Sequence, residues 1–373
     1  MARRKTRDIA AANGDAAGPA RPGIIAVAKQ ANVSIATVSR VLNKRGTVQP
    51  ELAKRVREAI QQTGYLPNVS ARSLSSGRSR IFGVIISNLM NPFFPELLQS
   101  FEEHAVAAGY EVLVASTAYD LQRMGSCIDR MLERKVDGVA VMTFGIEGPL
   151  LSRFVDHGIP LVFMDKAPEG PHNFAIEVDY ASGIQQAIQH LAVLGHRRIG
   201  FISGPEQQVS VANRMRAIER AARDIGLTYD PELLYAGDHT LESGEQGLAR
   251  FLALKSPPTA ILCSNDLSAI GVMHGAEERG LSIPHDLSLI GFDGIEIGGY
   301  MVPALTSVVM SRRAIAEQAV ELLWSSVEGR QGRPSTVSTH LLVRRTTAVP
   351  RGALADLSPA SQPAAGGRRK QSG

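Results

Sequence analysis

Cysteine is scarce in this sequence, which has only Cys127 and Cys263 among its 373 residues. Two cysteines so far apart provide neither a disulfide framework nor a repeated metal-ligand spacing, so we expect no structural disulfide and no metal site. Sparse cysteine without such a framework is typical of a protein in a reducing compartment.

Long apolar runs are absent as well. The longest, around IFGVIIS at residues 81–87, is far shorter than the roughly 20 residues that cross a bilayer. The N-terminus has no apolar core of signal-peptide length. These absences predict a cytoplasmic protein without a membrane partner, and they argue against a secreted solute-binding protein of a transporter.

The common catalytic motifs are missing too. The sequence has no glycine-rich phosphate loop of the P-loop type, no HExxH pair and no GxSxG elbow. We therefore expect neither an enzyme nor a bound cofactor. A sugar-binding or sugar-processing α/β protein with a basic N-terminal extension is the alternative, and it rests on fold analogy alone.

Positive charge is confined to the first fifth of the chain. Residues 1–80 contain 15 Lys and Arg against four Asp and Glu, a net +11, and because the whole chain carries +4 the remainder carries −7. A basic segment attached to an acidic body is typical of a module that binds a polyanion such as nucleic acid.

The segment VSIATVSRVLN, residues 33–43, lies inside this basic region but carries a single charge, Arg40. Its apolar residues recur at the spacing of one buried helix stripe: Val33, Val38, Val41 and Leu42. The opposite face carries small side chains. A helix that enters the major groove of DNA needs such a face, because its backbone must approach the base edges closely.

Helical periodicity continues on both sides of this segment. IIAVAKQA (residues 24–31) precedes it and ELAKRVREAIQQTG (residues 51–64) follows. Asn32 tolerates a left-handed turn, and Ser34 is placed to cap the second helix. Three short helices joined in this way predict an all-α helix-turn-helix domain over residues 23–66.

The second helix supplies the predicted DNA contacts. Arg40 is the candidate for a bidentate hydrogen bond to guanine, and Ile35 and Ala36 are candidates for contacts with thymine methyl groups. Neutral side chains of suitable size to hold phosphates are Ser34, Thr37, Ser39 and Asn43. The alternative for Arg40, taken alone, is a solvated surface arginine that reads no base.

From Ile81 onward the pattern changes to strand followed by helix. Short β-branched runs such as IFGVIIS, DGVAVMT and TAILCSND alternate with amphipathic helical stretches. This alternation predicts buried parallel strands in one or two doubly wound α/β sheets. Several strands end in a polar residue, Asp165, Asn265 and Asp293, at the sheet edge where open α/β sheets bind ligands.

These motifs closely resemble the LacI/GalR family of bacterial transcriptional regulators. The resemblance rests on VAKQANVSIATVSRVLN, GYLPNVSARSLSSGRS, GVIISNLMNPFF, LGHRRIGFISG, CSNDLSAIGV, LSLIGFDG and LLVRRTTA, and covers roughly residues 23–349. It implies a periplasmic-binding-protein-like core of two subdomains, each a doubly wound parallel sheet, with a cleft between them. Gly23 replaces a capping Thr and Ala26 an Asp, so the first helix is expected to lack its usual cap.

The resemblance implies that residues 67–79 form a hinge helix that pairs with its dimer mate in the minor groove. A segment this short holds no helix alone, so it is expected to order only on DNA. Asn68 and Ala71 would contact DNA there, and Leu74 would be the apolar wedge that parts the central base step. Without the resemblance, Leu74 reads as an ordinary linker leucine.

The resemblance also implies an effector site in the cleft. Its expected residues are Phe94, Asp165, Arg214, His239, Asn265 and Asp293. Carboxylates, an amide and an arginine fork suit hydrogen bonds to adjacent hydroxyl groups. Each residue also has an ordinary alternative, as a cap, a turn residue, a surface arginine or a core aromatic. His239 replaces a stacking aromatic of some members and Ala217 a usual glycine, which argues against a simple pyranose.

Together these observations predict a dimeric, effector-controlled transcriptional repressor on a near-palindromic operator. Its expected partners are double-stranded DNA, a sugar, sugar acid or nucleoside, and a second copy of the chain. The C-terminal segment lacks a leucine heptad, which favours a dimer over a tetramer. A nonspecific architectural DNA binder would have no use for a polar cleft.

The expected divisions follow from composition and from the resemblance. They are a disordered basic arm (1–22), the helix-turn-helix domain (23–66), the hinge helix and linker (67–79), an effector-binding and dimerisation core (80–349) and a disordered tail (350–373). Within the core, the N-subdomain is expected at about 80–178 and 310–339, and the C-subdomain at about 179–309 and 340–349.

Overall fold

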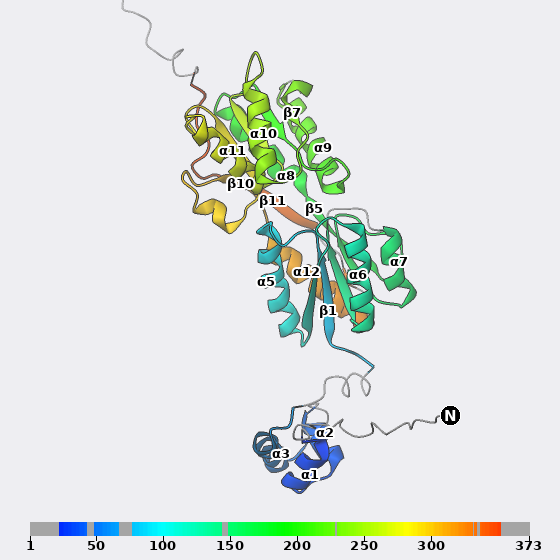
Figure 1. The fold of residues 1–373 in the computed structure, drawn as a ribbon. Coiled ribbons are helices and arrows are strands. Elements are labelled where there is room, and N and C mark those ends of the chain that lie inside the picture. Colours follow the sequence, from blue (N-terminus) through cyan, green and yellow to red (C-terminus); the bar gives the residue numbers. More distant parts are fainter. Residues whose placement is uncertain are drawn as a thin grey trace, which may run out of the picture. The chain divides into compact units, whose positions relative to one another are not determined.

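The computed structural model describes residues 22–42, 48–66, 77–143, 148–227, 230–330, 332–333 and 336–351. Its contacts fall into two compact units, Met1–Ser79 and Arg80–Gly373. The described part of the first unit is helical and the second unit is α/β (Figure 1). Among the helices in these ranges, none is long and apolar enough to cross a membrane.

The first unit is a bundle of three short helices. They are α1 (Ile24–Ala31), α2 (Ile35–Leu42) and α3 (Pro50–Thr63). Val27, Val38 and Val56, one from each helix, are fully buried in one hydrophobic cluster. The stripe predicted on α2 is confirmed, because Val33, Val41 and Leu42 pack against the same cluster. The bundle is therefore held together by aliphatic contacts between all three helices.

The second unit alternates strands and helices along the chain. Its strands are β1 (Ile81–Ile86), β2 (Glu111–Ser116), β3 (Gly138–Met142), β4 (Leu161–Met164), β5 (Asn173–Asp179), β6 (Ile199–Ile202), β7 (Leu234–Tyr235), β8 (Ala260–Cys263), β9 (Ser288–Asp293), β10 (Thr306–Met310) and β11 (Thr336–Leu342). Its α-helices are α5 (Phe93–Ala107), α6 (Leu121–Glu133), α7 (Gly148–Asp156), α8 (Tyr180–Val193), α9 (Val209–Asp224), α10 (Leu241–Leu252), α11 (Asp266–Glu278) and α12 (Arg312–Val327).

The strands form one hydrogen-bonded series with two halves. Their order is β2-β1-β3-β4-β5-β11-β10-β9-β8-β6-β7. Neighbours pair in parallel except β10 and β11, which are antiparallel. β11 pairs with β5 on one side and with β10 on the other, so it joins the sheet of the N-half (β1–β5) to that of the C-half (β6–β10). The predicted parallel α/β architecture is confirmed.

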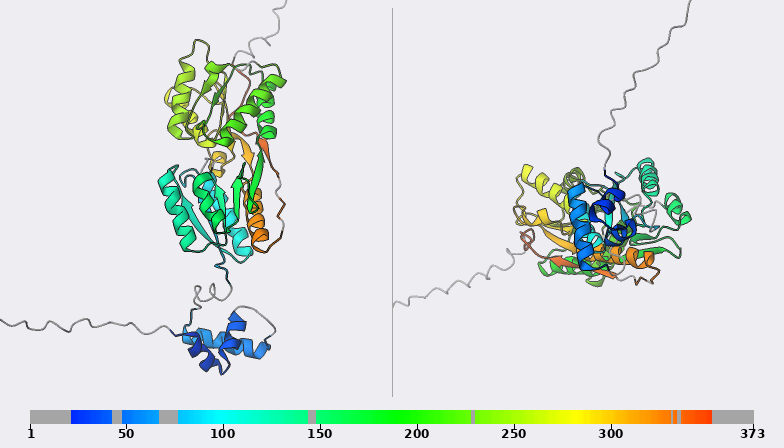
Figure 2. Two further views of the ribbon diagram at one scale, coloured as in Figure 1. Left: turned by 90° about the vertical axis from the view of Figure 1, so that its right-hand side faces the viewer. Right: turned by 90° about the horizontal axis from the view of Figure 1, so that it is seen from below.

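Helices cover both faces of each half (Figures 1 and 2). In the N-half, α5 and α12 pack on one face, and α6 and α7 contact each other on the opposite face. In the C-half, α8 and α9 cover one face, and α10 and α11 the other. One large hydrophobic cluster runs through both halves, because buried side chains of β1, α5, α8, β9 and α12 all belong to it.

The chain crosses between the halves after β10. β10 belongs to the C-half, but the next helix, α12, packs on α5 and beneath β3, β4 and β5 of the N-half. The crossing residue Ser311 caps α12, since its Oγ accepts a hydrogen bond from the backbone N–H of Ala314 at 3.2 Å. Arg312 therefore stands at the point where the two halves meet.

Candidate functional site

The first candidate site is the exposed face of α2. Ile35 is 47% exposed, Ala36 and Arg40 are exposed, and Thr37 and Ser39 are half-buried. The Oγ of Ser34 accepts a hydrogen bond from the backbone N–H of Thr37 at 3.1 Å, which confirms the predicted cap of α2. The face opposite the buried stripe thus presents small side chains and one arginine to solvent.

The turn before α2 is fixed by its backbone and by α3. Asn32 adopts the left-handed conformation with φ 50°, as its residue type predicts. Arg55 of α3 donates hydrogen bonds to the carbonyl oxygens of Ala31 and Asn32, at 2.5 and 3.2 Å. At the start of α1, Gly23 provides no side-chain cap, as expected. The turn between α1 and α2 is therefore held both by its own backbone conformation and by hydrogen bonds from α3.

Four of the predicted DNA-contacting residues lie outside the described residues. They are Asn43, Asn68, Ala71 and Leu74. Their contacts, and the hinge helix that contains the last three, stay predictions from the sequence.

The second candidate site joins the two halves of the α/β unit. Asp165 follows β4 of the N-half, and its Oδ2 accepts a hydrogen bond from the hydroxyl of Tyr180 at 2.8 Å. Arg214 of α9 lies 3.8 Å, Nη2 to Oδ1, from Asp293 at the end of β9. We call Asp165, Tyr180, Arg214 and Asp293 the polar cluster. The carboxyl ends of strands from both halves therefore contribute to one group of polar side chains.

Arg214 is held on its flat faces as well as at its edges. Its guanidinium carbon lies 4.0 Å from the ring centre of Phe292 and 5.0 Å from that of Tyr180. Its Nη1 donates a hydrogen bond to the carbonyl oxygen of Ser264. Only 2% of the residue is exposed. The structure therefore places this arginine in the interior and not on the surface.

Asn265 and His239 form a linked pair beside the cluster. The Oδ1 of Asn265 accepts a hydrogen bond from the backbone N–H of Ser268 and so caps α11. Its Nδ2 donates to the carbonyl oxygen of His239 at 3.0 Å. Both polar atoms of Asn265 are thus engaged within the protein, and the residue positions His239.

Phe94 lies in the hydrophobic core. Its ring is fully buried and packs edge-on against Phe93, with ring centres 5.4 Å apart. It belongs to the large cluster that runs through both halves. This placement matches the core alternative for Phe94.

Three of the expected effector residues have unusual backbone conformations. Asp165, His239 and Asp293 have φ angles of 69°, 69° and 108°. Such angles are uncommon for residues other than glycine and cluster at functional sites, where surrounding contacts hold the strain. Sequence alone does not reveal this feature.

Burial controls the protonation of these groups. Burial raises the pKa of Asp293 to about 8, with Arg214 opposing the shift, and raises the pKa of Asp165 to about 6, opposed by the hydrogen bond from Tyr180. Burial, and then the charge of Arg214, lowers the pKa of His239 to about 3. The imidazole of His239 is therefore neutral at physiological pH.

Several buried polar atoms around Arg214 have no hydrogen-bond partner. They are Gln208 Oε1, Ser210 Oγ, His239 Nε2 and Ser264 Oγ. Gln208 and Ser210 flank the start of α9, which carries Arg214, and the carbonyl of Ser264 binds its guanidinium. Buried polar groups are normally paired, so these atoms indicate a place where a ligand completes the structure.

Gln208, Ser210 and Ser264 are not among the site residues predicted from the sequence. Ser264 had a usable signal, since it stands beside Asn265 at the end of β8. Ser210 had one as well, because it precedes Arg214 by four residues on α9 and so lies on the same face of that helix. Gln208, the residue before α9, gave none.

A second charged link crosses between the halves next to Asp293. Arg312 donates hydrogen bonds from Nη1 to the carbonyl oxygen of Asp293 at 2.8 Å and from Nη2 to that of Gly294 at 3.0 Å. Its Nε lies 2.8 Å from Oε2 of Glu96 on α5. The Oε1 of Glu96 accepts a hydrogen bond from the backbone N–H of Glu296 at 2.9 Å. The loop after β9 is therefore tied directly to the first turn of α5.

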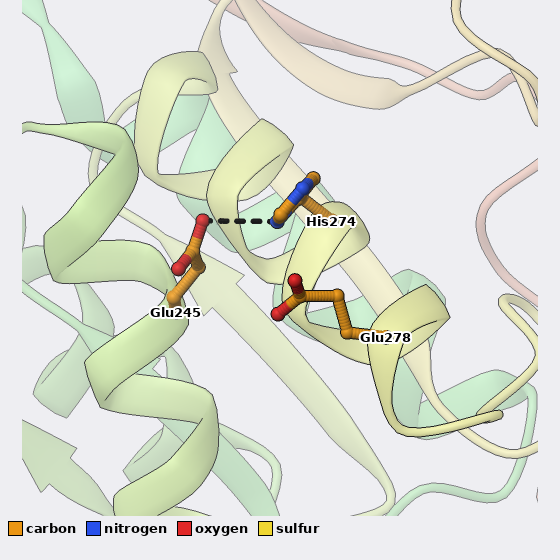
Figure 3. A group of neighbouring side chains, drawn as sticks. All are labelled: Glu245, His274 and Glu278. Carbon is orange, nitrogen blue, oxygen red and sulfur yellow. Dashed lines mark ion pairs between the residues drawn. The ribbon is translucent and has the colours of Figure 1, made fainter.

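Figure 3 shows a group of side chains of the kinds that bind metal ions, on α10 and α11. Glu245, His274 and Glu278 place one ligand atom each within 4.8 Å of one another. The Nδ1 of His274 already pairs with Oε1 of Glu245 at 3.0 Å, and the His274 side chain is 58% exposed. His274 stands nine residues, about 13 Å, along α11 from Asn265, so the group is separate from the polar cluster.

Two family models match the chain. The model of bacterial regulatory proteins, lacI family, matches residues 24–68, and that of a periplasmic binding protein-like domain matches residues 188–347. The chain is 34% identical over 307 residues to the HTH-type transcriptional repressor PurR of Aliivibrio fischeri (strain ATCC 700601 / ES114), covering 82% of this chain and 91% of that protein. It is 33% identical over 298 residues to catabolite control protein A of Priestia megaterium, covering 80% of this chain and 90% of that protein.

The chain is also similar to solved structures of transcriptional regulators. The chain is similar to a lac repressor dimer bound to operator and the anti-inducer ONPF, with a TM-score of 0.76 and 26% identity, covering 86% of this chain and 98% of that one. It is also similar to the transcriptional regulator CelR in complex with cellobiose, with a TM-score of 0.65 and 26% identity, covering 87% of this chain and 100% of that one. These relatives regulate transcription and are not enzymes. The chain belongs to the LacI family of bacterial transcriptional regulators.

Proposed function

We propose that the chain is a transcriptional repressor that binds a near-palindromic operator as a homodimer and is controlled by a small polar effector. The exposed face of α2 carries the DNA-binding part of this proposal. Ala36 and Arg40 lie on the side of the helix opposite the buried Val38, and Ile35, the first residue of α2, is 47% exposed, so all three are available to base edges while the bundle stays intact.

The proposed assignment of roles follows the domain divisions. Residues 23–66 bind the major groove, residues 67–79 form the hinge, and the core at 80–349 binds the effector and the second subunit. Ser34, Thr37, Ser39 and Asn43 hold phosphates, and Asn68, Ala71 and Leu74 contact the minor groove. The protein acts in the cytoplasm, where the chromosomal operator lies.

The effector site is proposed at the polar cluster. Asp165, Arg214 and Asp293 come from both halves, and buried polar atoms without partners surround Arg214. Asn265 positions His239 beside them, and Phe94 supports the site from the core. The proposed effector belongs to the sugars, sugar acids or nucleosides. In the related structures, CelR holds cellobiose and the lac repressor holds an anti-inducer.

The link from Arg312 to Glu96 supports control of DNA binding by the effector. A ligand that moves Asp293 also moves the carbonyl groups that Arg312 binds. Glu96 and Arg312 then pass the displacement to α5 and α12 of the N-half. An effector shifts the balance between two arrangements of the halves only by binding one of them more tightly.

Arg40→Ala tests the base-reading role. We expect the variant to lose roughly 1–3 kcal/mol of binding free energy on the operator while its binding to random duplex is spared. Arg57→Ala removes an equal charge from the exposed surface of α3 and is the matched control. Fluorescence anisotropy at one salt concentration measures both affinities. An equal loss on operator and random DNA would show that Arg40 contributes only its charge.

A further inference from the structure

The group of Glu245, His274 and Glu278 on α10 and α11 has the composition of a transition-metal site. Imidazole nitrogen and carboxylate oxygen are common zinc ligands. Magnesium and calcium take mainly oxygen ligands instead, so a histidine in the set favours zinc or a similar transition metal. The expectation of no metal site came from the spacing of the cysteines, and none of these three residues is a cysteine.

The three side chains converge on one point. His274 and Glu278 are four residues apart on α11 and so share one face of that helix, while Glu245 comes from α10. Figure 3 shows the carboxylate of Glu278 directed toward the other two groups. Three atoms within 4.8 Å of one another share a point at most about 2.8 Å from each, and zinc–ligand distances are about 2.0–2.2 Å. Small rotations of the glutamate side chains close this difference.

The two helices that carry these ligands pack closely against each other. A methyl group at Gly271 of α11 would lie 1.9 Å from the backbone oxygen of Leu241 at the start of α10. A methyl group at Gly275, the residue after His274, would lie 3.4 Å from Cγ of Glu245. The backbones at Glu245 and His274 are therefore fixed relative to each other. Sites built on rigid helices hold their ligands more exactly than sites on loops.

The charges of the group favour a cation. Nδ1 of His274 lies 3.0 Å from Oε1 of Glu245, and the second carboxylate, that of Glu278, comes within 4.8 Å of both residues. Two carboxylates this close repel each other, and a dication between them removes the repulsion. The neighbouring Arg279 donates its Nη1 to the backbone carbonyl of Gly275 at 2.8 Å, so this donor is engaged by the helix itself. A zinc ion that replaces the hydrogen between Nδ1 and Oε1 meets two ligands that already face each other.

We propose that Glu245, His274 and Glu278 bind one zinc ion on the surface of the C-half. Three protein ligands leave one position of a four-coordinate zinc ion to water, which suits a group that is open to solvent. The bound ion ties α10 to α11 through side chains, in addition to the close packing of the two helices. This site is separate from the polar cluster, so it does not depend on the proposed effector.

Isothermal titration calorimetry with zinc chloride tests the site on the full-length protein, after a chelator has removed bound metal. We expect the unmodified chain to bind one zinc ion at this site. His274→Asn and Glu278→Gln should each lower the zinc affinity at least about 10-fold, since even residues that only support metal ligands contribute roughly 10- to 100-fold. Magnesium chloride in about tenfold excess should not displace zinc, because magnesium prefers oxygen ligands.

His285→Asn and Glu277→Gln are the matched controls. His285 is an exposed histidine of the same half, and Glu277 is the exposed neighbour of Glu278 on α11. Each control makes the same chemical change as its test variant at a position outside the group. Both controls should bind zinc as tightly as the unmodified protein.

The proposal is overturned if the unmodified protein binds no zinc, or if zinc binding is unchanged in both test variants. Equal losses in the test and control variants would also overturn it, because they would show general binding to surface histidine and glutamate. Circular dichroism checks that each variant is folded. If one test variant does not fold, Glu245→Gln takes its place, with the same expected loss of zinc affinity.

Discussion

Replacing Arg312 with alanine tests the link between the halves. The side chain of Arg312 is 19% exposed and that of its partner Glu96 is 22% exposed. Arg312→Ala leaves the carbonyl oxygens of Asp293 and Gly294 without their charged donor and Glu96 without its counter-ion. The variant therefore removes every polar contact described between this arginine and the loop after β9.

The magnitude follows from these contacts. Hydrogen bonds with a charged partner contribute roughly 1.5–3 kcal/mol each, and water replaces part of that where the side chain is one-fifth exposed. We expect Arg312→Ala to lower the free energy of unfolding by about 2–4 kcal/mol. Glu96→Gln keeps an acceptor for the N–H of Glu296 but removes the charge. The coupling between the two substitutions should be about 1–2 kcal/mol, above the 0–1 kcal/mol of exposed pairs.

Urea unfolding of the four proteins in this double-mutant cycle measures the coupling, and hydrogen exchange of the amides at 294–296 localises it. Arg313→Ala, at the exposed neighbouring position, is the control and should change little. Coupling near zero, or unchanged exchange at 294–296 in Arg312→Ala, would refute the idea that this ion pair holds the loop to α5.

Three further predictions concern packing, pH and ligand response. A methyl group at Gly244 would lie 2.0 Å from the backbone oxygen of Ser268, where α10 packs on α11. Gly244→Ala should therefore lower the free energy of unfolding, measured in urea, by roughly 1–3 kcal/mol. Gly125→Ala is the control and should not lower it, because a methyl group at Gly125 meets nothing within 4 Å. The pKa of Asp293 is raised from 3.8 to about 8, so the native state binds this proton more tightly and its contribution to stability falls as pH rises from about 4 to 8. In Asp293→Asn the free energy of unfolding should therefore fall less steeply between pH 6 and 8 than in the unmodified protein. An unchanged slope of this free energy against pH would contradict the raised pKa of Asp293. Asp293→Ala should keep operator binding and abolish the effector response; a normal response would remove Asp293 from the site.

Much of the fold is readable from local sequence pattern. The strands β1, β3, β4, β6, β8 and β9 are predicted from short apolar runs, because a parallel strand buried on both faces leaves little room for polar residues. The edge strand β2 has mostly exposed or half-buried positions, and its valines are the signal that predicts it. β5 and β11 were not predicted, because they mix buried and exposed positions where the halves join. β10 contains Thr306 and Ser307, whose burial depends on hydrogen bonds to Thr346 and Asp266 that only the folded chain provides.

Part of the candidate site was predictable because it lies at the ends of strands that the local sequence pattern reveals. Asp165, Asn265 and Asp293 are at the carboxyl ends of predictable strands, so their positions followed from the pattern of alternation. The engagement of Asn265 as a cap and the link from Arg312 to Glu96 did not follow, since both depend on contacts between segments distant in sequence.

The first experiment to make is selection of bound sequences from a random duplex pool by the purified full-length protein at stated salt. Two α2 helices related by two-fold symmetry should recover a near-palindromic motif, with a flexible step at its centre if Leu74 acts as the wedge. Recovery of such a motif, lost in Arg40→Ala, is the result we expect. Recovery of no motif, or of the same unsymmetrical sequences with and without Arg40, would contradict a dimeric, sequence-specific repressor.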